Sequence, residues 1–237
     1  MTDSHDADAV KEFFDQWALY RKIVDWNYLF HREASEALSR FLDGFQSPFS
    51  FLDLGCGDAG VAGSLLRGRS IRSYTGIDLS PVALELASRN LKDACVAAEL
   101  IREDFFSGVE TLKVHYDVIF IGLSLHHLHS NEKRDFLPQL RRKLSTGGKL
   151  VIFDPVLSSG ESRADYLQRW VKGARASWNS LSSEEIDAAV NHVTTSDFPE
   201  EIDTLSQMAV DAGFHPATVL YRDPTGFYAL MVFESRQ

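Results

Sequence analysis

Hydrophobic positions divide the chain into a helical beginning and a middle in which short apolar runs alternate with helical patterns. Before Ser50, apolar residues recur at helical spacing, from Phe13 to Val24 and again from Ala34 to Leu42. Beyond that point, runs of strand length occur at Phe49–Leu54, Ser73–Asp78, Glu99–Arg102, Tyr116–Gly122 and Lys149–Asp154. Strands that alternate with helices indicate an open, parallel α/β sheet.

Capping and turn residues set the expected helix boundaries in this middle part. Ser80-Pro81 supplies an N-cap and a first-turn proline for a helix that runs to about Asn90. Gly147-Gly148 is expected to close a helix that starts near Asn131. Pro138 falls inside that pattern and lacks an N–H donor, so the helix is predicted either to kink or to begin later.

The chain changes character after Asp154-Pro155. A stretch of about sixty residues lacks strand character, which predicts a helical cap rather than a simple loop. Within it, Ser182-x-x-Glu185 reads as a capping box, and Pro199 is expected to open a helix that stops at Gly213. The β-rich runs Thr218–Tyr221 and Phe227–Phe233 then flank a strong turn signal, which predicts an antiparallel hairpin.

Composition limits the classes of partner. The chain has 237 residues, 44% of them hydrophobic, and can bury a full core. A net charge of −10 argues against a nucleic-acid partner, because phosphate binding relies on clustered basic residues. The densest basic group is expected to be a solvated helix face and comprises Lys133, Arg134, Arg141, Arg142 and Lys143.

Cysteine usage and the first residues bear on location. The two cysteines, Cys56 and Cys95, are not spaced as a redox pair and are expected to be free thiols in a reducing cytosol. Acids occupy the first residues, where a signal peptide would carry positive charge, and the apolar runs are too short to span a bilayer. These features predict a cytoplasmic protein without a membrane partner; the oligomeric state stays open.

The segment Asp53-Leu54-Gly55-Cys56-Gly57-Asp58-Ala59-Gly60 carries the strongest chemical signal, because an acid and three glycines follow an apolar run. Glycines let the backbone turn sharply and approach a ligand closely. The spacing Gly55-x-Gly57-x-x-Gly60 also matches the dinucleotide fingerprint, so an NAD-linked oxidoreductase is an alternative. Asp53 and the terminal hairpin argue against that alternative.

Five ordered motifs together resemble those of class I S-adenosylmethionine-dependent methyltransferases. They are Asp53-Leu54-Gly55-Cys56-Gly57, Thr75-Gly76-Ile77-Asp78-Leu79-Ser80, Arg102-Glu103-Asp104-Phe105-Phe106, Tyr116-Asp117-Val118-Ile119-Phe120 and Gly147-Gly148-Lys149-Leu150-Val151-Ile152-Phe153. The resemblance covers residues 49–153 in detail and extends to the hairpin.

This resemblance implies an α/β fold with a seven-stranded Rossmann-like methyltransferase sheet. The sheet would be parallel with an antiparallel C-terminal hairpin, and N-terminal helices and a helical insertion after the fifth strand would act as the cap. We expect a single domain with a lid (1–46), a cosubstrate-binding core (47–154), a cap (155–212) and a hairpin (213–237).

The chemistry of S-adenosylmethionine suggests a role for each strand-end acid. Asp53 can attract the ammonium, Asp78 can accept both ribose hydroxyls, and Asp104 can accept the adenine amine. Each acid also has a structural alternative, as a helix cap, a turn acid or a loop acid. The expected cosubstrate site comprises Asp53, Gly55, Cys56, Gly57, Asp78, Leu79, Asp104, Phe105 and, by resemblance, Leu123.

Three histidines follow the fourth expected strand, where open α/β sheets place their ligands. His127 and His126 are candidates for a general base or a hydrogen-bond donor, and ordering of the loop is the alternative. No metal site is predicted, because no cysteine or acid stands at ligand spacing beside them.

Aromatic residues of the N-terminal helices and the cap are candidates for acceptor contact, although helical spacing also explains them as packing residues. The candidates are Tyr20, Tyr28, His31, Tyr166 and Trp170, with Arg21, Arg169 and Trp178 beside them. The chain lacks the Asn/Asp-Pro-Pro-Tyr/Phe and Pro-Cys motifs of base methylation. We therefore expect methyl transfer to an O or N atom of a small-molecule acceptor; a non-catalytic S-adenosylmethionine-binding regulator is a further alternative.

Overall fold

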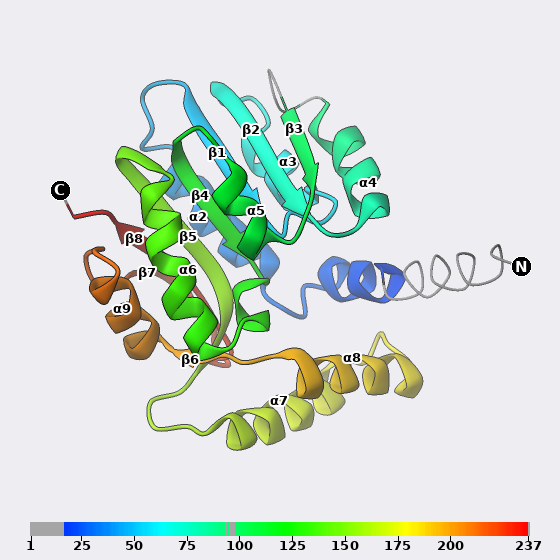
Figure 1. Cartoon of the computed structure of the whole chain (residues 1–237). Helices are drawn as coiled ribbons and strands as arrows, with labels where there is room; N and C mark the ends of the chain where they lie inside the picture. Colours follow the sequence, from blue (N-terminus) through cyan, green and yellow to red (C-terminus); the bar gives the residue numbers. More distant parts are fainter. Residues whose placement is uncertain (1–16, 93, 95–97, 237) are drawn as a thin grey trace, which may run out of the picture.

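A central sheet flanked by helices organises the computed structural model, which describes residues 17–92, 94 and 98–236 (Figure 1). The strand order is β3-β2-β1-β4-β5-β8-β7, and β6 pairs with β5. The strands are β1 (Phe49–Leu54), β2 (Ile71–Asp78), β3 (Ala98–Arg102), β4 (Tyr116–Gly122), β5 (Leu144–Leu157), β6 (Glu200–Glu201), β7 (Thr218–Arg222) and β8 (Tyr228–Glu234).

Strand directions confirm the predicted sheet. Neighbours among β1 to β5 pair in parallel, whereas β8 pairs antiparallel with both β5 and β7. The predicted seven strands form the main path of the sheet, and the two-residue β6 is an addition. The carboxyl ends of β1, β2 and β4 therefore lie at one edge, where α/β proteins place ligands.

Alternating side chains of the buried strands make two separate cores. In β1, Leu52 and Leu54 join one core, and Phe49 and Phe51 join the other. The first core is covered by α5 (Phe105–Thr111), α6 (Ser130–Arg142) and α9 (Ile202–Asp211). The second is covered by α2 (His31–Leu42), α3 (Gly60–Leu66) and α4 (Pro81–Leu91).

A third apolar cluster forms the cap. It joins α7 (Arg163–Ser177) to α8 (Ser183–Ser196), with Tyr166 and Trp170 from α7 against Ile186 and Val193 from α8. Ile23, from the helical residues 17–25, packs into the same cluster. Figure 1 shows α7 and α8 below the sheet, with the 17–25 helix above α8. Part of the predicted N-terminal stripe and Cys95 lie outside the described residues; Cys56 is a free thiol.

The predicted role of Gly147-Gly148 is wrong. Helix α6 continues through Pro138 and ends at Arg142, before the two glycines. Leu144 pairs with Tyr116 and Lys149 with Val118, so residues 145–148 form a bulge within β5. Gly147 has φ 79°, and a Cβ at Gly148 would lie 2.8 Å from the Tyr116 carbonyl oxygen, which explains both glycines.

Two further predictions need correction, one on the helix expected to start at Pro199 and one on the solvated basic face that includes Lys133. Pro199 precedes β6 rather than a helix, and α9 begins at Ile202. Lys133 is 1% exposed rather than solvated; its amine donates to the Phe198 carbonyl and lies 3.3 Å from Glu200. This buried cation fixes the end of the cap to α6, a role that the surrounding basic residues concealed in the sequence.

Candidate active site

A cavity of about 230 Å³ lies at the glycine loop after β1. Its walls come from the glycine loop with the start of α3, from the ends of β1, β4 and β5, from the segment after β4, and from the N-terminal helices. We call it the glycine-loop cavity; it is lined by Trp17, Tyr20, His31, Asp53, Gly55, Cys56, Gly57, Asp58, Ala59, Gly60, Val61, Ala62, Phe120, Gly122, Leu123, Ser124 and Phe153.

Backbone geometry makes glycine necessary at the start of this loop. Gly55 has φ 69°, and a Cβ there would lie 2.3 Å from the Ser124 Oγ. Gly57 also has a positive φ, 53°. A side chain at Gly55 would thus be strained and would collide with the segment after β4.

Asp53 supplies a buried negative charge to the wall of the glycine-loop cavity. Its side chain accepts a hydrogen bond of 2.8 Å from the Tyr74 hydroxyl. Burial raises the pKa of Asp53 to about 7, despite the opposing effect of that hydrogen bond. A cationic ligand would stabilise the ionised carboxylate. The neighbouring Cys56 is also buried, and burial raises the pKa of its thiol, so it is a poor nucleophile.

Asp78 joins the end of β2 to the glycine loop. Its Oδ2 accepts from the Gly57 N–H and its Oδ1 from the Ser80 N–H, both at 2.8 Å. The carboxylate is half-buried, so its outer face can still accept hydroxyl groups. Leu79 follows with 64% of its surface exposed.

Asp104 begins a helix, whereas its structural alternative in the sequence is a loop acid. It is the N-cap of α5 and accepts from the Phe106 and Ser107 N–H groups at 3.0 and 3.1 Å. Phe105 packs on Phe136 at a ring distance of 5.6 Å. Neither Asp104 nor Phe105 lines the glycine-loop cavity, and their contact with adenine stays a prediction.

A larger cavity of about 530 Å³ lies under the cap. It shares Trp17, Tyr20 and Leu123 with the glycine-loop cavity. We call it the cap cavity; its other lining residues are Leu19, Ile23, Leu29, His126, His127, Pro155, Trp170, Trp178, Ala188, Ala189, Asn191, His192, Val193, Thr195, Asp197 and Tyr228. Most of these side chains are apolar, and the polar ones include three histidines and one acid.

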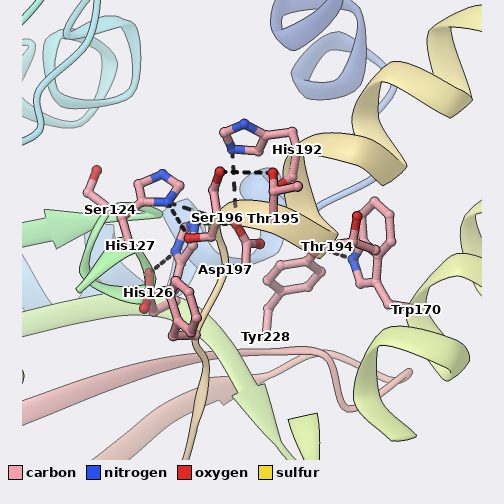
Figure 2. Close-up of polar contacts among 12 residues, drawn as sticks. Ser124, His126, His127, Trp170, His192, Thr194, Thr195, Ser196, Asp197 and Tyr228 are labelled. Atoms are coloured by element: carbon pink, nitrogen blue, oxygen red, sulfur yellow. Dashed lines mark hydrogen bonds and ion pairs between the residues drawn. The ribbon is translucent and has the colours of Figure 1, made fainter. Parts of the chain in front are cut away.

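His126 lies between two carboxylates at the polar end of the cap cavity (Figure 2). Its Nδ1 lies 2.8 Å from Asp154 Oδ1, and its Nε2 lies 3.5 Å from Asp197 Oδ1. Burial alone would lower the pKa of His126, but Asp154 and Asp197 outweigh that effect and raise it. Both ring nitrogens face acids, so His126 is not free to contact an acceptor directly.

His127 is the more accessible histidine, with 38% of its side chain exposed. Its Nδ1 lies 3.1 Å from the Ser196 carbonyl oxygen and can donate to it, which leaves Nε2 as an acceptor. Burial and the neighbouring His126 lower the pKa of His127 to about 4. His192, from α8, lies 4.0 Å from Asp197 and packs edge-on against the His127 ring.

Three residues of this cluster, Asp154, Asp197 and His192, are not predicted from the sequence. Asp154 is predicted only as the end of the fifth strand, and Asp197 reaches His126 from the far end of the cap. The signal for Asp154 was its place at the carboxyl end of a parallel strand; no local pattern distinguished the other two.

The predicted acceptor contacts separate into different environments. Tyr20 and His31 line the glycine-loop cavity, and the Tyr20 hydroxyl lies 3.4 Å from His31 Nε2. Burial lowers the pKa of His31 to about 4. Trp170 lines the cap cavity and donates to the Tyr228 hydroxyl at 2.9 Å. Tyr28 instead stacks on Trp178 and lines a third cavity of about 260 Å³.

Tyr166, a predicted acceptor contact, lies outside both the glycine-loop cavity and the cap cavity. It is fully buried in the cap cluster, edge-on to Phe227. Arg169 lies over the Tyr166 and Phe227 rings and pairs with Glu161 at 2.7 Å. Arg21 pairs with Asp58 of the glycine loop at 3.1 Å, which ties the N-terminal helix to that loop.

Comparisons with known proteins agree with this geometry. Residues 51–148 match a family described as a methyltransferase domain. The phthiotriol/phenolphthiotriol dimycocerosates methyltransferase of Mycobacterium leprae is 30% identical over 164 residues, which cover 68% of this chain and 54% of that protein. The chain thus spans about half the length of this curated relative.

Solved structures show the same fold at low sequence identity. The plantazolicin methyltransferase BpumL, solved with S-adenosylhomocysteine, has a TM-score of 0.65 at 17% identity, covering 94% of this chain and 92% of that chain. The magnesium protoporphyrin IX methyltransferase of Synechocystis has a TM-score of 0.65 at 13% identity, covering 97% of this chain and 99% of that chain.

The described helices are too short or too polar to span a bilayer.

The predicted family, fold, enzyme class and cosubstrate agree with these findings. Residues 51–148 therefore match a methyltransferase domain, and the ordered motifs and the fold of the described chain resemble those of class I S-adenosylmethionine-dependent methyltransferases.

Proposed function

We propose that this chain transfers a methyl group from S-adenosylmethionine to an oxygen or nitrogen atom of a small, largely apolar acceptor. The observation that carries the proposal is that Trp17, Tyr20 and Leu123 line both the glycine-loop cavity and the cap cavity, so the two cavities are neighbours. A donor held in the first cavity can present its methyl group to an acceptor in the second.

In this proposal the methionyl end of the cosubstrate occupies the glycine-loop cavity. The buried carboxylate of Asp53 attracts the ammonium, directly or through water, and Gly55 and Gly57 leave room for the ligand. Asp78 accepts from the ribose hydroxyls through its exposed face, and the exposed Leu79 packs beside the nucleoside. Asp104 and Phe105 are assigned to the adenine, and Cys56 to packing within the turn.

Methyl transfer is proposed to proceed by in-line displacement. A lone pair of the acceptor forms the new bond to the methyl carbon while the sulfur–carbon bond breaks, and the electron pair of that bond neutralises the sulfonium. The acceptor proton passes to water or to His127, whose Nε2 is an acceptor in the cap cavity. Alignment alone can supply on the order of 7 kcal/mol of the barrier reduction.

The lining of the cap cavity supports a small apolar acceptor with a polar end. Trp17, Trp170 and Trp178 line it together with aliphatic side chains, whereas the histidines and Asp197 make one polar wall. Similar methyltransferases are named for phthiotriol dimycocerosates and for magnesium protoporphyrin IX, which is consistent with this class of acceptor. The net charge of −10 does not favour a nucleic-acid acceptor.

We also propose a single domain that works in the cytoplasm. The free thiol of Cys56 and the scarcity of cysteine support a reducing compartment.

Release of S-adenosylhomocysteine on addition of acceptors tests the proposed function. A panel of apolar phenols, alcohols and amines should contain compounds that produce one S-adenosylhomocysteine per methylated product. A protein that binds S-adenosylmethionine but releases none with any acceptor would be a regulator. Binding of NADH instead of S-adenosylmethionine would favour the oxidoreductase alternative.

A further inference from the structure

The cluster of His126, His127 and Asp197 has the donors of a metal site, and nothing above uses it in that way. Each residue offers one ligand atom, and these atoms lie within 4.8 Å of one another on the wall of the cap cavity. We propose that this cluster binds one divalent transition-metal ion of the zinc class, with a coordination position open to the acceptor.

The distances are close to those of a tetrahedral site. His126 Nε2 and His127 Nδ1 lie 3.5 and 3.8 Å from Asp197 Oδ1. Ligand atoms bound to zinc at its usual bond lengths would be separated by about 3.3 Å, so small side-chain movements close the site. Two imidazoles and one carboxylate also suit zinc, or iron(II), better than magnesium.

Asp197 supplies the second, independent observation. Its side chain is 7% exposed, and within the described part of the chain its Oδ1 accepts no hydrogen bond. A buried carboxylate oxygen without a donor is costly, and a bound cation removes that cost. The oxygen lies against His126, His127 and His192, so the missing positive charge belongs among these rings (Figure 2).

Asp154 orients His126 for this role. It lies 2.8 Å from Nδ1, and with the ring proton on Nδ1 the Nε2 lone pair points towards Asp197. A carboxylate behind a metal-binding histidine commonly fixes the ring in this way. His127 would exchange its hydrogen bond to Ser196 for the ion, which moves its ring proton to Nε2 and leaves water to take the acceptor proton. His192 lies 4.0 Å from Asp197 as a further ligand donor.

The alternative occupant of the cluster is a proton. His126 held as an imidazolium would also offset one of the two flanking negative charges, with no metal present. A bound ion would in addition offer an open coordination position to an oxygen atom of the acceptor at the polar wall of the cap cavity, a consequence that rests on the proposed function. No acid stands near the histidines in the sequence, which is why no metal site is predicted there; the fold brings Asp197 to them.

Titration of the chelator-stripped protein with Zn²⁺ tests the site by calorimetry and by metal analysis after dialysis. We expect one Zn²⁺ per chain, and binding at least 100-fold weaker in Asp197→Asn. Binding should be unchanged in His215→Ala, which removes an exposed histidine outside the cluster. With Co²⁺ as the probe, the wild type should show the visible absorption of a four- or five-coordinate site, and Asp197→Asn should not.

Two further variants keep the test decisive if Asp197→Asn is unstable. His127→Asn changes a partly exposed ligand and should also weaken Zn²⁺ binding, and Asp154→Asn should weaken it about 10- to 100-fold through the orientation of His126. Equal Zn²⁺ binding by His127→Asn and the wild type, or no stoichiometric site in the wild type, would overturn the proposal and favour the imidazolium.

S-adenosylmethionine binding separates this proposal from the proposed function. It should occur in stripped and Zn²⁺-loaded protein alike, because Asp53 and the glycine loop are outside the cluster. Stoichiometric Zn²⁺ without methyl transfer would count against the proposed function alone, and methyl transfer by a protein that binds no Zn²⁺ would count against the metal site alone.

Discussion

The glycine-loop cavity and the cap cavity are built in different ways. The first takes much of its lining from one continuous stretch, residues 53–62 at the end of β1, the glycine loop and the start of α3. The second gathers side chains from the N-terminal helix, the segment after β4, and the cap. The difference teaches that the donor site depends on backbone geometry, whereas the acceptor site depends on how separate elements pack.

Polar contacts join the cap helices to each other, to α6 and to the N-terminal helix at a few points. Arg163 donates to the carbonyls of Asp197 and Thr194, and Lys133 holds Phe198 to α6. Lys22 pairs with Glu185, which joins the N-terminal helix to α8. Changes to the cap should therefore affect acceptor use while they leave the donor site intact, and each prediction below tests that separation.

Gly55→Ala should have the largest effect. The new Cβ would meet Ser124 and adopt an unfavourable φ, at a cost of about 2 to 5 kcal/mol in stability or binding. We expect loss of measurable S-adenosylmethionine binding by calorimetry and a lower melting temperature.

Gly68→Ala is the matched control for that substitution. Gly68 has φ 76° and nothing within 4 Å of a built Cβ, so it should show the backbone strain alone, about 1 kcal/mol. The double variant Gly55→Ala/Ser124→Gly removes the collision and should recover part of the binding. Equal effects of Gly55→Ala and Gly68→Ala would contradict the proposed close contact.

Asp53→Asn should weaken S-adenosylmethionine binding by about 10- to 100-fold, because a charge-assisted contact to the ammonium is lost. The same change should stabilise the unliganded protein by on the order of 1 to 4 kcal/mol, since burial raises the pKa of Asp53 to about 7 and ionisation opposes folding. Calorimetry and thermal unfolding measure the two effects.

The pH dependence gives an independent check on Asp53. The ligand needs the ionised carboxylate, so affinity for S-adenosylmethionine should fall as pH drops through 7, and the unliganded protein should gain stability over the same range. Asp53→Asn should remove this dependence, and Asp43→Asn, at an exposed ion pair, should retain it.

Ala188→Trp should affect only the acceptor. Ala188 is an exposed residue of α8 that lines the cap cavity, and an indole there would occupy acceptor space. We expect kcat/KM for the acceptor to fall by about tenfold, the equivalent of about 1.4 kcal/mol, with the Kd of S-adenosylmethionine unchanged. Ala176→Trp, at an exposed position of α7, should have no effect. A higher Kd for S-adenosylmethionine in Ala188→Trp would show that a change in the cap cavity also affects the donor site.

Arg21→Gln should have the smallest effect. Its ion pair with Asp58 is exposed on the arginine side, and such pairs contribute about 0 to 1 kcal/mol. The Kd of S-adenosylmethionine should rise by less than about fivefold. Asp25→Asn breaks only the longer 3.8 Å pair with Arg21 and should be silent.

Local sequence signals predicted the core of the fold well. The apolar runs that became β1, β2 and β4 carry their own alternation or burial pattern, and Ser80-Pro81 caps α4 as expected. Gly147-Gly148 was wrongly predicted to end a helix, because glycines occur both at helix ends and in bulges. The sequence alone does not distinguish an Asp104 that contacts a ligand from one that caps a helix.

The histidine cluster could not be predicted for a different reason. His126 meets Asp197 across 71 positions of the chain, and tertiary contacts set that meeting. The Phe198 N–H donates to the His126 carbonyl, and Lys133 donates to the Phe198 carbonyl. No periodicity within either segment encodes such a contact. The single-domain division and the roles of individual site residues stay predictions.

Calorimetric titration of the wild-type chain with S-adenosylmethionine, with NADH in a parallel titration, tests the central claim most directly. The account predicts one S-adenosylmethionine site per chain, lost in Gly55→Ala, and no heat with NADH. A dinucleotide that binds in place of S-adenosylmethionine, or the absence of any binding of the cosubstrate by the folded protein, would contradict it.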